Sequence, residues 1–213
     1  MFGFYDLDGS DISTADLQSL VINNGIGVLS NYLGARSTNI QNANIPGFEL
    51  SIVGQGNFTD NISFSTLAGY TYINPTPINA DSSYLLTFSN PNFENPNTTI
   101  LKYRNKHMVK IDFQIDYKKL AFGLSTRYSS LMENIDDVFV SPIAGIEILP
   151  GYGSYRDSRM TGDLVYDTRL SYRINKKSKF SLLVNNLLNR EYTNRPGNVL
   201  PPRTILWQYS LKF

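Results

Sequence analysis

The feature that most constrains the fold is a strict alternation of apolar and polar residues along extended segments. The alternation is clearest over residues 108–117. One face of that segment carries five apolar residues, Val109, Ile111, Phe113, Ile115 and Tyr117. The other face carries four polar or charged residues, Lys110, Asp112, Gln114 and Asp116. A period of two residues indicates a β-strand that separates an apolar environment from a polar one.

The same alternation recurs in segments separated by connections of unequal length. The further alternating segments are residues 48–53, 62–73, 120–128, 164–174 and 205–213. The connections alternate between short ones, at residues 54–61, 118–119 and 175–179, and long ones, at residues 74–106, 130–162 and 190–202. Barrels of the outer membrane alternate short periplasmic turns with longer extracellular loops. A soluble β-sandwich has no reason to sort its loops by length.

We therefore predict an all-β fold, an antiparallel up-and-down transmembrane β-barrel, of which this chain supplies about seven strands. The apolar faces would contact lipid, and the polar faces, which carry charges of both signs, would line a wet lumen. No run of 18 apolar residues occurs, so a transmembrane helix is excluded.

Three segments depart from the alternation. The pattern Ser13-x-x-Asp16, followed by apolar residues at helical spacing, predicts a short helix within a long N-terminal loop. Residues 74–106 show no strand period and are predicted to form a loop. Phe2–Tyr5 is a candidate for the end of an eighth strand of the barrel.

The C-terminal residues resemble a known family. Four motifs occur there in order: Val184–Tyr192, Arg195–Gly197, Pro202–Thr204 and a final strand that ends at Phe213. Together they resemble the C-terminus of TonB-dependent outer-membrane receptors. Upstream, Asn42–Leu50 and Gly69–Tyr72 resemble a descending and an ascending strand of the same family. The resemblance extends over residues 32–213.

The resemblance implies a barrel of ~22 strands that encloses a plug. Residues 1–213 would be the C-terminal segment of that barrel, with the plug domain and the signal peptide absent. Met1–Asp6 lacks the basic and apolar regions of a signal peptide, which agrees with this expectation. The implied location is the bacterial outer membrane, where the barrel is an integral protein.

The function implied by the resemblance is energised uptake of a scarce, bulky ligand such as a ferric siderophore. The implied partners are outer-membrane lipid, the N-terminal plug with the remaining barrel strands, a TonB-type energy-coupling complex, and an iron chelate or similar ligand. The alternative is a small self-contained outer-membrane barrel that acts as an adhesin or a barrel enzyme.

Two sets of residues are candidates for functional roles. Aromatic and arginine residues of the long loops would line a ligand vestibule: Tyr84, Phe88, Arg104, Tyr152, Tyr155 and Arg156. Such loop aromatics also pack against each other, and charged loop residues are usually only solvated. The resemblance implies a second set, read by the barrel-assembly machinery: Trp207, Tyr209, Leu211 and Phe213.

Composition argues against several other functions. The net charge of +1 gives no electrostatic footprint for nucleic acid. The chain has no cysteine, which excludes disulfides and thiolate metal sites. His107 is the one histidine, and we interpret it as a solvated residue where a loop becomes a strand. We therefore expect no catalytic site, no metal and no cofactor.

Overall fold

The computed structural model describes residues 2–4, 12, 14–24, 33–35, 42–78, 99–140, 142 and 147–213. The described residues fall into two compact units. The sheet unit takes in Pro46–Asn74, Asn105–Leu131 and Thr161–Phe213. The loop unit takes in the described parts of Met1–Ile45, Pro75–Arg104 and Met132–Met160. No helix among the described residues is long and apolar enough to cross a membrane.

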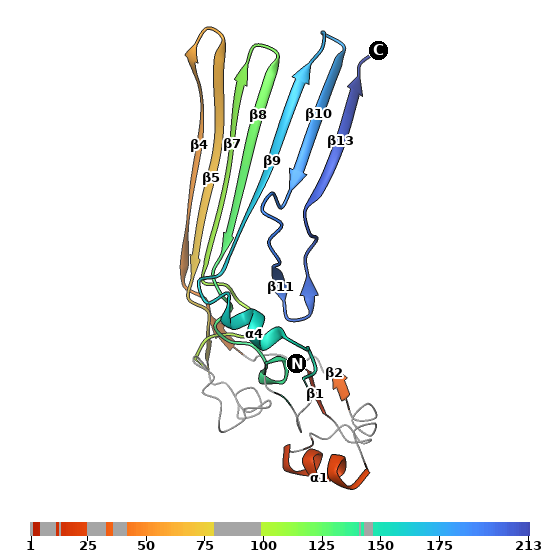
Figure 1. The fold of residues 1–213 in the computed structure, drawn as a ribbon. Helices are drawn as coiled ribbons and strands as arrows, with labels where there is room; N and C mark the ends of the chain where they lie inside the picture. Colours follow the sequence, from red (N-terminus) through yellow and green to blue (C-terminus); the bar gives the residue numbers. More distant parts are fainter. Residues whose placement is uncertain are drawn as a thin grey trace. The chain divides into compact units, whose positions relative to one another are not determined.

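The sheet unit contains a seven-stranded antiparallel sheet (Figure 1). Its strands, in chain order, are β4 (Gly47–Thr59), β5 (Ile62–Ile73), β7 (His107–Tyr117), β8 (Leu120–Ser129), β9 (Asp163–Arg173), β10 (Ser178–Asn185) and β13 (Thr204–Leu211). Each strand pairs with the next strand of the sheet along the chain, in the order β13-β10-β9-β8-β7-β5-β4. This meander confirms the predicted up-and-down arrangement and the expected number of strands.

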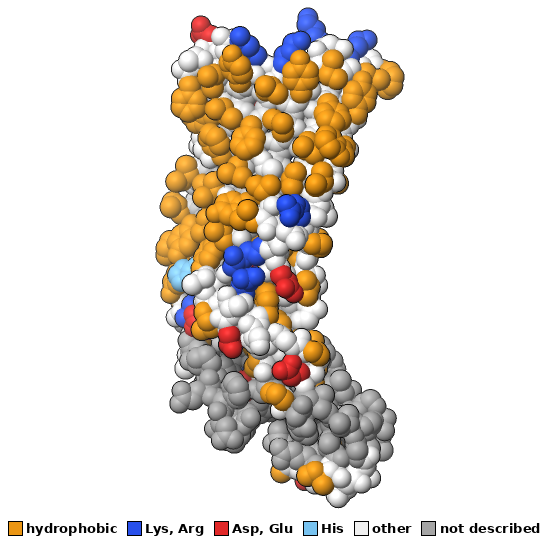
Figure 2. Space-filling view, viewed as in Figure 1, with side chains coloured by type: hydrophobic (Ala, Val, Ile, Leu, Met, Phe, Trp, Pro, Cys, Tyr) orange, Lys and Arg blue, Asp and Glu red, His pale blue; other side chains and the backbone are white. Residues whose placement is uncertain are grey.

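The register keeps most apolar and polar residues on separate faces of the sheet, with Leu67 on the polar face as an exception. Ile111 lies opposite Ala68 and Thr126, whereas Asp112 lies opposite Leu67 and Ser125. Residues that lie directly opposite each other in an antiparallel pair point to the same face. The face assignment predicted from the alternation is therefore confirmed. Figure 2 shows hydrophobic side chains gathered over the strands, and many of them are exposed, as expected of a face that contacts lipid.

Local chemistry fixes the short turns. Lys118 has a φ of 53°, and a positive φ at the first central residue is what two-residue hairpin turns require. In the turn between β9 and β10, the side-chain oxygen of Asn175 accepts hydrogen bonds from the backbone N–H groups of Lys177 and Ser178. These turns set the Tyr117–Leu120 pair and the registers of the adjoining strands.

Aromatic residues flank the aliphatic band of the apolar face. At the end from which the long connections leave, the ring of Phe48 contacts those of Tyr70 and Tyr72, with centroids 5.6 and 5.7 Å apart. The hydroxyl of Tyr70 lies 2.9 Å from Nδ1 of His107. His107 is the first residue of β7, so its predicted place at the boundary between loop and strand is confirmed. Its side chain is only partly exposed and packs with Tyr70 and Tyr72, so the expectation of a fully solvated residue is wrong.

The opposite end of the sheet carries a second aromatic row. Phe58 stacks on Phe64 with centroids 4.6 Å apart, and Phe180 contacts Trp207 with centroids 5.4 Å apart. Two aromatic girdles around an aliphatic band are typical of barrels that span a membrane, because aromatic rings favour the headgroup level.

Short elements make up the rest of the described chain. They are β1 (Phe2–Phe4), α1 (Thr14–Asn24), β2 (Leu33–Ala35), β3 (Asn42–Asn44), β6 (Thr76–Ile78), η2 (Asp137–Phe139), α4 (Tyr152–Asp157), β11 (Thr193–Arg195) and β12 (Asn198–Val199). The predicted N-terminal helix is confirmed by α1. The prediction of a strand-free loop at 74–106 is wrong at its start, because β6 pairs with β3. The Phe2–Tyr5 segment adds no eighth strand, since β1 pairs with β2 outside the large sheet.

Candidate functional site

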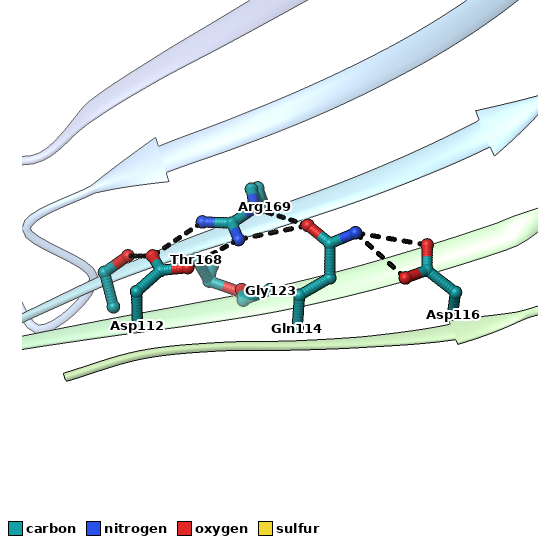
Figure 3. Close-up of polar contacts among 7 residues, drawn as sticks. Asp112, Gln114, Asp116, Gly123, Thr168 and Arg169 are labelled. Atoms are coloured by element: carbon teal, nitrogen blue, oxygen red, sulfur yellow. Dashed lines mark hydrogen bonds and ion pairs between the residues drawn. The ribbon is translucent and has the colours of Figure 1, made fainter. Parts of the chain in front are cut away.

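The polar face of β7, β8 and β9 holds a network centred on Arg169 (Figure 3). The two terminal nitrogens of Arg169 donate to the two carboxylate oxygens of Asp112 at 2.9 and 2.8 Å. Arg169 also donates to the side-chain oxygen of Gln114, whose amide nitrogen donates to both oxygens of Asp116. Ser125 donates its hydroxyl to Asp112. We call this group, with Arg127 and Asp167, the polar wall.

A glycine makes the central contact possible. Arg169 and Asp112 lie on β9 and β7, and Gly123 of β8 lies directly opposite Arg169. A Cβ atom at Gly123 would come within 2.4 Å of Nε of Arg169. The guanidinium therefore passes over a strand that offers no side chain at that point. A glycine inside a strand pattern indicates a close approach of this kind, so Gly123 is the signal in the sequence that could have indicated the contact.

The polar wall continues toward the end of the sheet with the long connections. Arg127 donates to Asp167 at 2.8 Å, and Asp167 also accepts the backbone N–H of Asn186 at 2.7 Å. Asn186 has a φ of 51° and is almost fully buried. Its side chain accepts the N–H of Arg190 and donates to the carbonyls of Arg190 and Pro201. The Asn-rich motif is thus a hydrogen-bonded corner that ends β10.

The chemistry available to the polar wall is hydrogen bonding and charge pairing. Asp112 and Arg169 remain 34% and 33% exposed, so water reaches the network. Among the described residues, no group of three or more His, Cys, Asp or Glu side chains lies close enough to hold a metal ion. Such a surface can bind polar groups of a partner, and the hydrogen bonds among its side chains hold those side chains in place.

A second network, which we call the loop cluster, joins Ile100–Tyr103 to Asn134–Asp137 in the loop unit. Nζ of Lys102 lies 2.5 Å from Asp136, and the hydroxyl of Tyr103 donates to the same carboxylate. The side-chain amide of Asn134 donates to the carbonyl of Ile100 at 2.6 Å. The backbone carbonyl of Asn134 accepts the N–H of Tyr103 at 2.9 Å. Burial, followed by the charge of Asp136, raises the pKa of Tyr103 far above its ordinary value, so Tyr103 stays a neutral donor.

The carboxyl group of Asp137 in the loop cluster has a raised pKa. Burial raises the pKa of its carboxyl to about 6. The neighbouring charge of Lys102 lowers this pKa, and that of Asp136 raises it, but burial dominates. Part of the Asp137 population is therefore protonated at mildly acidic pH.

Three of the predicted ligand residues lie together on α4. The rings of Tyr152 and Tyr155 stack with centroids 5.7 Å apart. Arg156 donates to the carbonyl of Glu133 at 3.2 Å, and burial lowers its pKa. Arg104 is exposed in the same unit. Tyr84 and Phe88 lie outside the described residues. Whether these side chains bind a ligand stays a prediction.

The residues predicted to signal assembly lie at the C-terminal end of the sheet. Trp207 and Tyr209 of β13 pair with Leu182 and Phe180, on the apolar face, and both are exposed. Leu211 is the last residue of β13, and Phe213 lies beyond the strand with its side chain fully exposed. Their role in assembly also stays a prediction.

Comparison with known families identifies the chain. Residues 2–187 match the family described as TonB dependent receptor-like, beta-barrel. The chain belongs to this family, as its motifs and its open antiparallel sheet both indicate. The family consists of non-enzymatic transporters that are integral to the outer membrane, which confirms the predicted class and location. No curated protein sequence matches the chain.

Solved structures of receptors share the fold. The ferric-catecholate import receptor Fiu from E. coli K12, in its closed form, matches 80% of this chain with 23% identity and a TM-score of 0.55. The siderophore receptor PiuA from Acinetobacter baumannii matches 80% of the chain with 19% identity and a TM-score of 0.50. The chain spans 21% of the Fiu chain and 22% of the PiuA chain.

Proposed function

We propose that this chain is the C-terminal part of a longer receptor that takes up an iron chelate, such as a ferric siderophore, across the outer membrane. The observation that carries the proposal is the open seven-stranded sheet with one apolar face and one charged face. The apolar face needs a nonpolar environment, which lipid supplies in an outer-membrane barrel, and the charged face needs water or polar groups of protein. A self-contained barrel would need β4 to pair with β13, whereas both are edges of this sheet.

The proposed partners are inferred from the two edges and the two faces of the seven-stranded sheet. The edges present unpaired backbone groups, which in a membrane must pair with further strands of the same barrel. The apolar face contacts outer-membrane lipid, and the polar wall faces the plug inside the lumen. A TonB-type complex supplies energy through a part of the receptor outside this chain.

The ligand residues of the proposal lie in the loops. Ferric siderophores are bulky and often anionic, with aromatic or amide groups around the metal. The stacked rings of Tyr152 and Tyr155 offer flat apolar surfaces, and the exposed Arg104 offers a guanidinium group that can donate hydrogen bonds to an anionic chelate. Tyr84, Phe88 and Arg156 complete the proposed set. Arg156 also braces α4 through Glu133, so it serves the shape of the site as well.

The test is equilibrium binding by the full-length receptor in detergent, with a ferric tris-catecholate and a ferric tris-hydroxamate as separate probes. We expect one of the two chelates to bind tightly, and Tyr152→Ala combined with Arg104→Gln to weaken it about tenfold or more, the loss expected for residues at the centre of a binding surface. Met160→Ala, an exposed change in the same unit, is the matched control. Failure of both chelates to bind, together with normal growth of a deletion strain under iron limitation, would refute the siderophore proposal.

We propose further that Trp207, Tyr209, Leu211 and Phe213 form the segment that the assembly machinery reads. Deleting Phe213 from the full-length receptor should lower its outer-membrane level strongly. The molecules that insert should melt almost normally, because one aromatic side chain contributes only about 1.5–3 kcal/mol through burial. Unchanged outer-membrane levels would show that Phe213 is an ordinary terminal residue.

A further inference from the structure

Positive charge is concentrated at the end of the sheet where the short turns lie. Seven of the chain's 19 Lys and Arg residues occur there, all exposed: Lys118, Lys119, Arg173, Lys176, Lys177, Lys179 and Lys212. The acidic residues of the described sheet near this end are Asp60 and Asp116, although the whole chain has 18 Asp and Glu residues. Figure 2 shows Lys and Arg side chains along this end, beside the hydrophobic band. We call the seven residues the basic rim.

Backbone pairing holds the residues of the basic rim next to one another. The N–H of Arg173 donates to the carbonyl of Lys119 at 2.8 Å, and the N–H of Lys212 donates to the carbonyl of Lys177 at 2.8 Å. Arg173 also lies directly opposite Lys179. Within the part of the chain that the structure describes, the ion pairs involve other residues. Like charges opposite each other destabilise a sheet, and an anion bound here would offset that repulsion.

The basic rim adjoins the aromatic row of the apolar face. Nζ of Lys118 lies 5.3 Å from the ring centroid of Tyr117, a residue of that face. Tyr172, Phe180 and Tyr209 lie on the same face near the same end. Aromatic rings mark the headgroup level of a membrane, and long basic side chains next to them reach into the headgroups. At the headgroup level of a membrane, the abundant anion is a lipid phosphate.

We propose that the basic rim binds the phosphate groups of anionic phospholipids in the periplasmic leaflet. Short turns of outer-membrane barrels lie on the periplasmic side, which places the rim in the phospholipid leaflet. Clusters of Lys and Arg next to a membrane attract anionic headgroups within a Debye length. The binding recruits a shell of phosphatidylglycerol or cardiolipin around this sector of the barrel. A soluble acidic partner would not explain why the basic rim lies next to an aromatic row on the apolar face.

The experiment uses the full-length receptor reconstituted into phosphatidylcholine bilayers that contain a spin-labelled lipid. The electron paramagnetic resonance spectrum gives the fraction of labelled lipid at the protein surface, for phosphatidylglycerol and for phosphatidylcholine separately. We expect phosphatidylglycerol to be favoured about fivefold or more at low ionic strength, the effect expected of a few basic residues at a membrane surface. The preference should weaken as salt is added.

The diagnostic variant is Lys118→Gln/Lys119→Gln/Lys176→Gln/Lys177→Gln, which removes four of the seven charges of the basic rim and should lower the preference strongly. The matched control is Arg195→Gln/Arg203→Gln, which removes exposed charge at the other end of the sheet and should keep the preference. A heat-modifiable shift on a gel confirms that each variant is folded. Equal preference in the wild type and the Lys variant would overturn the proposal. Displacement of the labelled lipid by inorganic phosphate beyond that caused by chloride at the same ionic strength would also overturn it, because the site would then be one for a free anion.

Discussion

The polar wall and the loop cluster hold their charged groups in opposite ways. In the wall, Asp112 and Arg169 are each about one-third exposed and share hydrogen bonds with Gln114 and Ser125. In the loop cluster, the side chains of Lys102 and Asp136 are 8% and 0% exposed. Solvated ion pairs contribute about 0–1 kcal/mol, whereas removing one partner of a buried pair costs about 3–5 kcal/mol. We infer that the strand register holds the side chains of the polar wall in place, whereas the stability of the loop cluster depends strongly on its buried ion pair.

The packing of the two regions agrees with this contrast. The loop unit buries the aliphatic residues Ile100, Leu101 and Ile135 beside its ion pair. In the sheet, large side chains such as Phe122 and Leu170 remain exposed on the apolar face. The loop unit therefore carries a small core of its own, while the sheet obtains its apolar contacts from lipid.

The largest effect should come from removing the buried carboxylate of the loop cluster. Asp136→Ala removes the buried carboxylate that both Lys102 and Tyr103 contact, and we expect a loss of about 3–5 kcal/mol in local stability. Hydrogen exchange of the backbone amides at 100–103 and 134–137 in the full-length receptor measures this loss. Asp112→Ala is the matched change in the polar wall and should cost only about 0–1 kcal/mol there. Equal losses of stability at the two sites would contradict the proposed difference between the buried and the solvated ion pair.

A charge placed on the apolar face should have the next largest effect. Ile111→Arg puts a guanidinium in the lipid-facing band and should destabilise the folded receptor by about 2–4 kcal/mol if it lies near the bilayer midplane. Ser65→Arg, on the polar face of β5, lies opposite Gln114 and should cost little. Denaturant titrations after folding into lipid vesicles give both values. A cost for Ser65→Arg as large as that for Ile111→Arg would contradict the assignment of faces.

A smaller loss of stability should follow from adding a side chain at Gly123, where Arg169 crosses β8. In Gly123→Ala, the added methyl group collides with the guanidinium of Arg169, and we expect this overpacking to cost about 1–3 kcal/mol and to displace Arg169 from Asp112. The control is Gly69→Ala, also on the polar face, where a Cβ atom would have no heavy atom within 4 Å. The same titrations compare the two variants. If both glycines tolerate alanine equally, Arg169 does not need the gap.

The smallest effect should be a dependence of the loop cluster on pH. The pKa of Asp137 rises from its ordinary value of 3.8 to about 6, so the folded form binds this proton more tightly than the unfolded form. The stabilisation from protonation is therefore present below pH 3.8 and is lost as the pH rises to about 6. Hydrogen exchange at 134–140, corrected for intrinsic rates, should show protection falling over this range. In Asp137→Asn that part of the pH dependence should vanish, and its persistence would assign it to another group.

The strands of the large sheet, most of their face assignments and the short turns follow from local sequence alone. A period of two residues is a local property, and it places Ile111 and Asp112 on opposite faces whatever the partner strands are. The turns at Lys118 and Asn175 are equally local, because their geometry depends on φ and on hydrogen bonds across two or three residues. Short turns between alternating segments then make an antiparallel meander the simplest pairing.

Only the tertiary structure decided which side chains meet across long separations. Arg169 finds Asp112 because the register of three strands brings Gly123 between them. Lys102 and Asp136 meet 34 residues apart, and His107 meets Tyr70 at a similar separation, without any periodic signal that names the partner. The pairing of β1 with β2 has the same origin. Local sequence fixes the direction in which a side chain points, but its partner depends on how distant segments pack together.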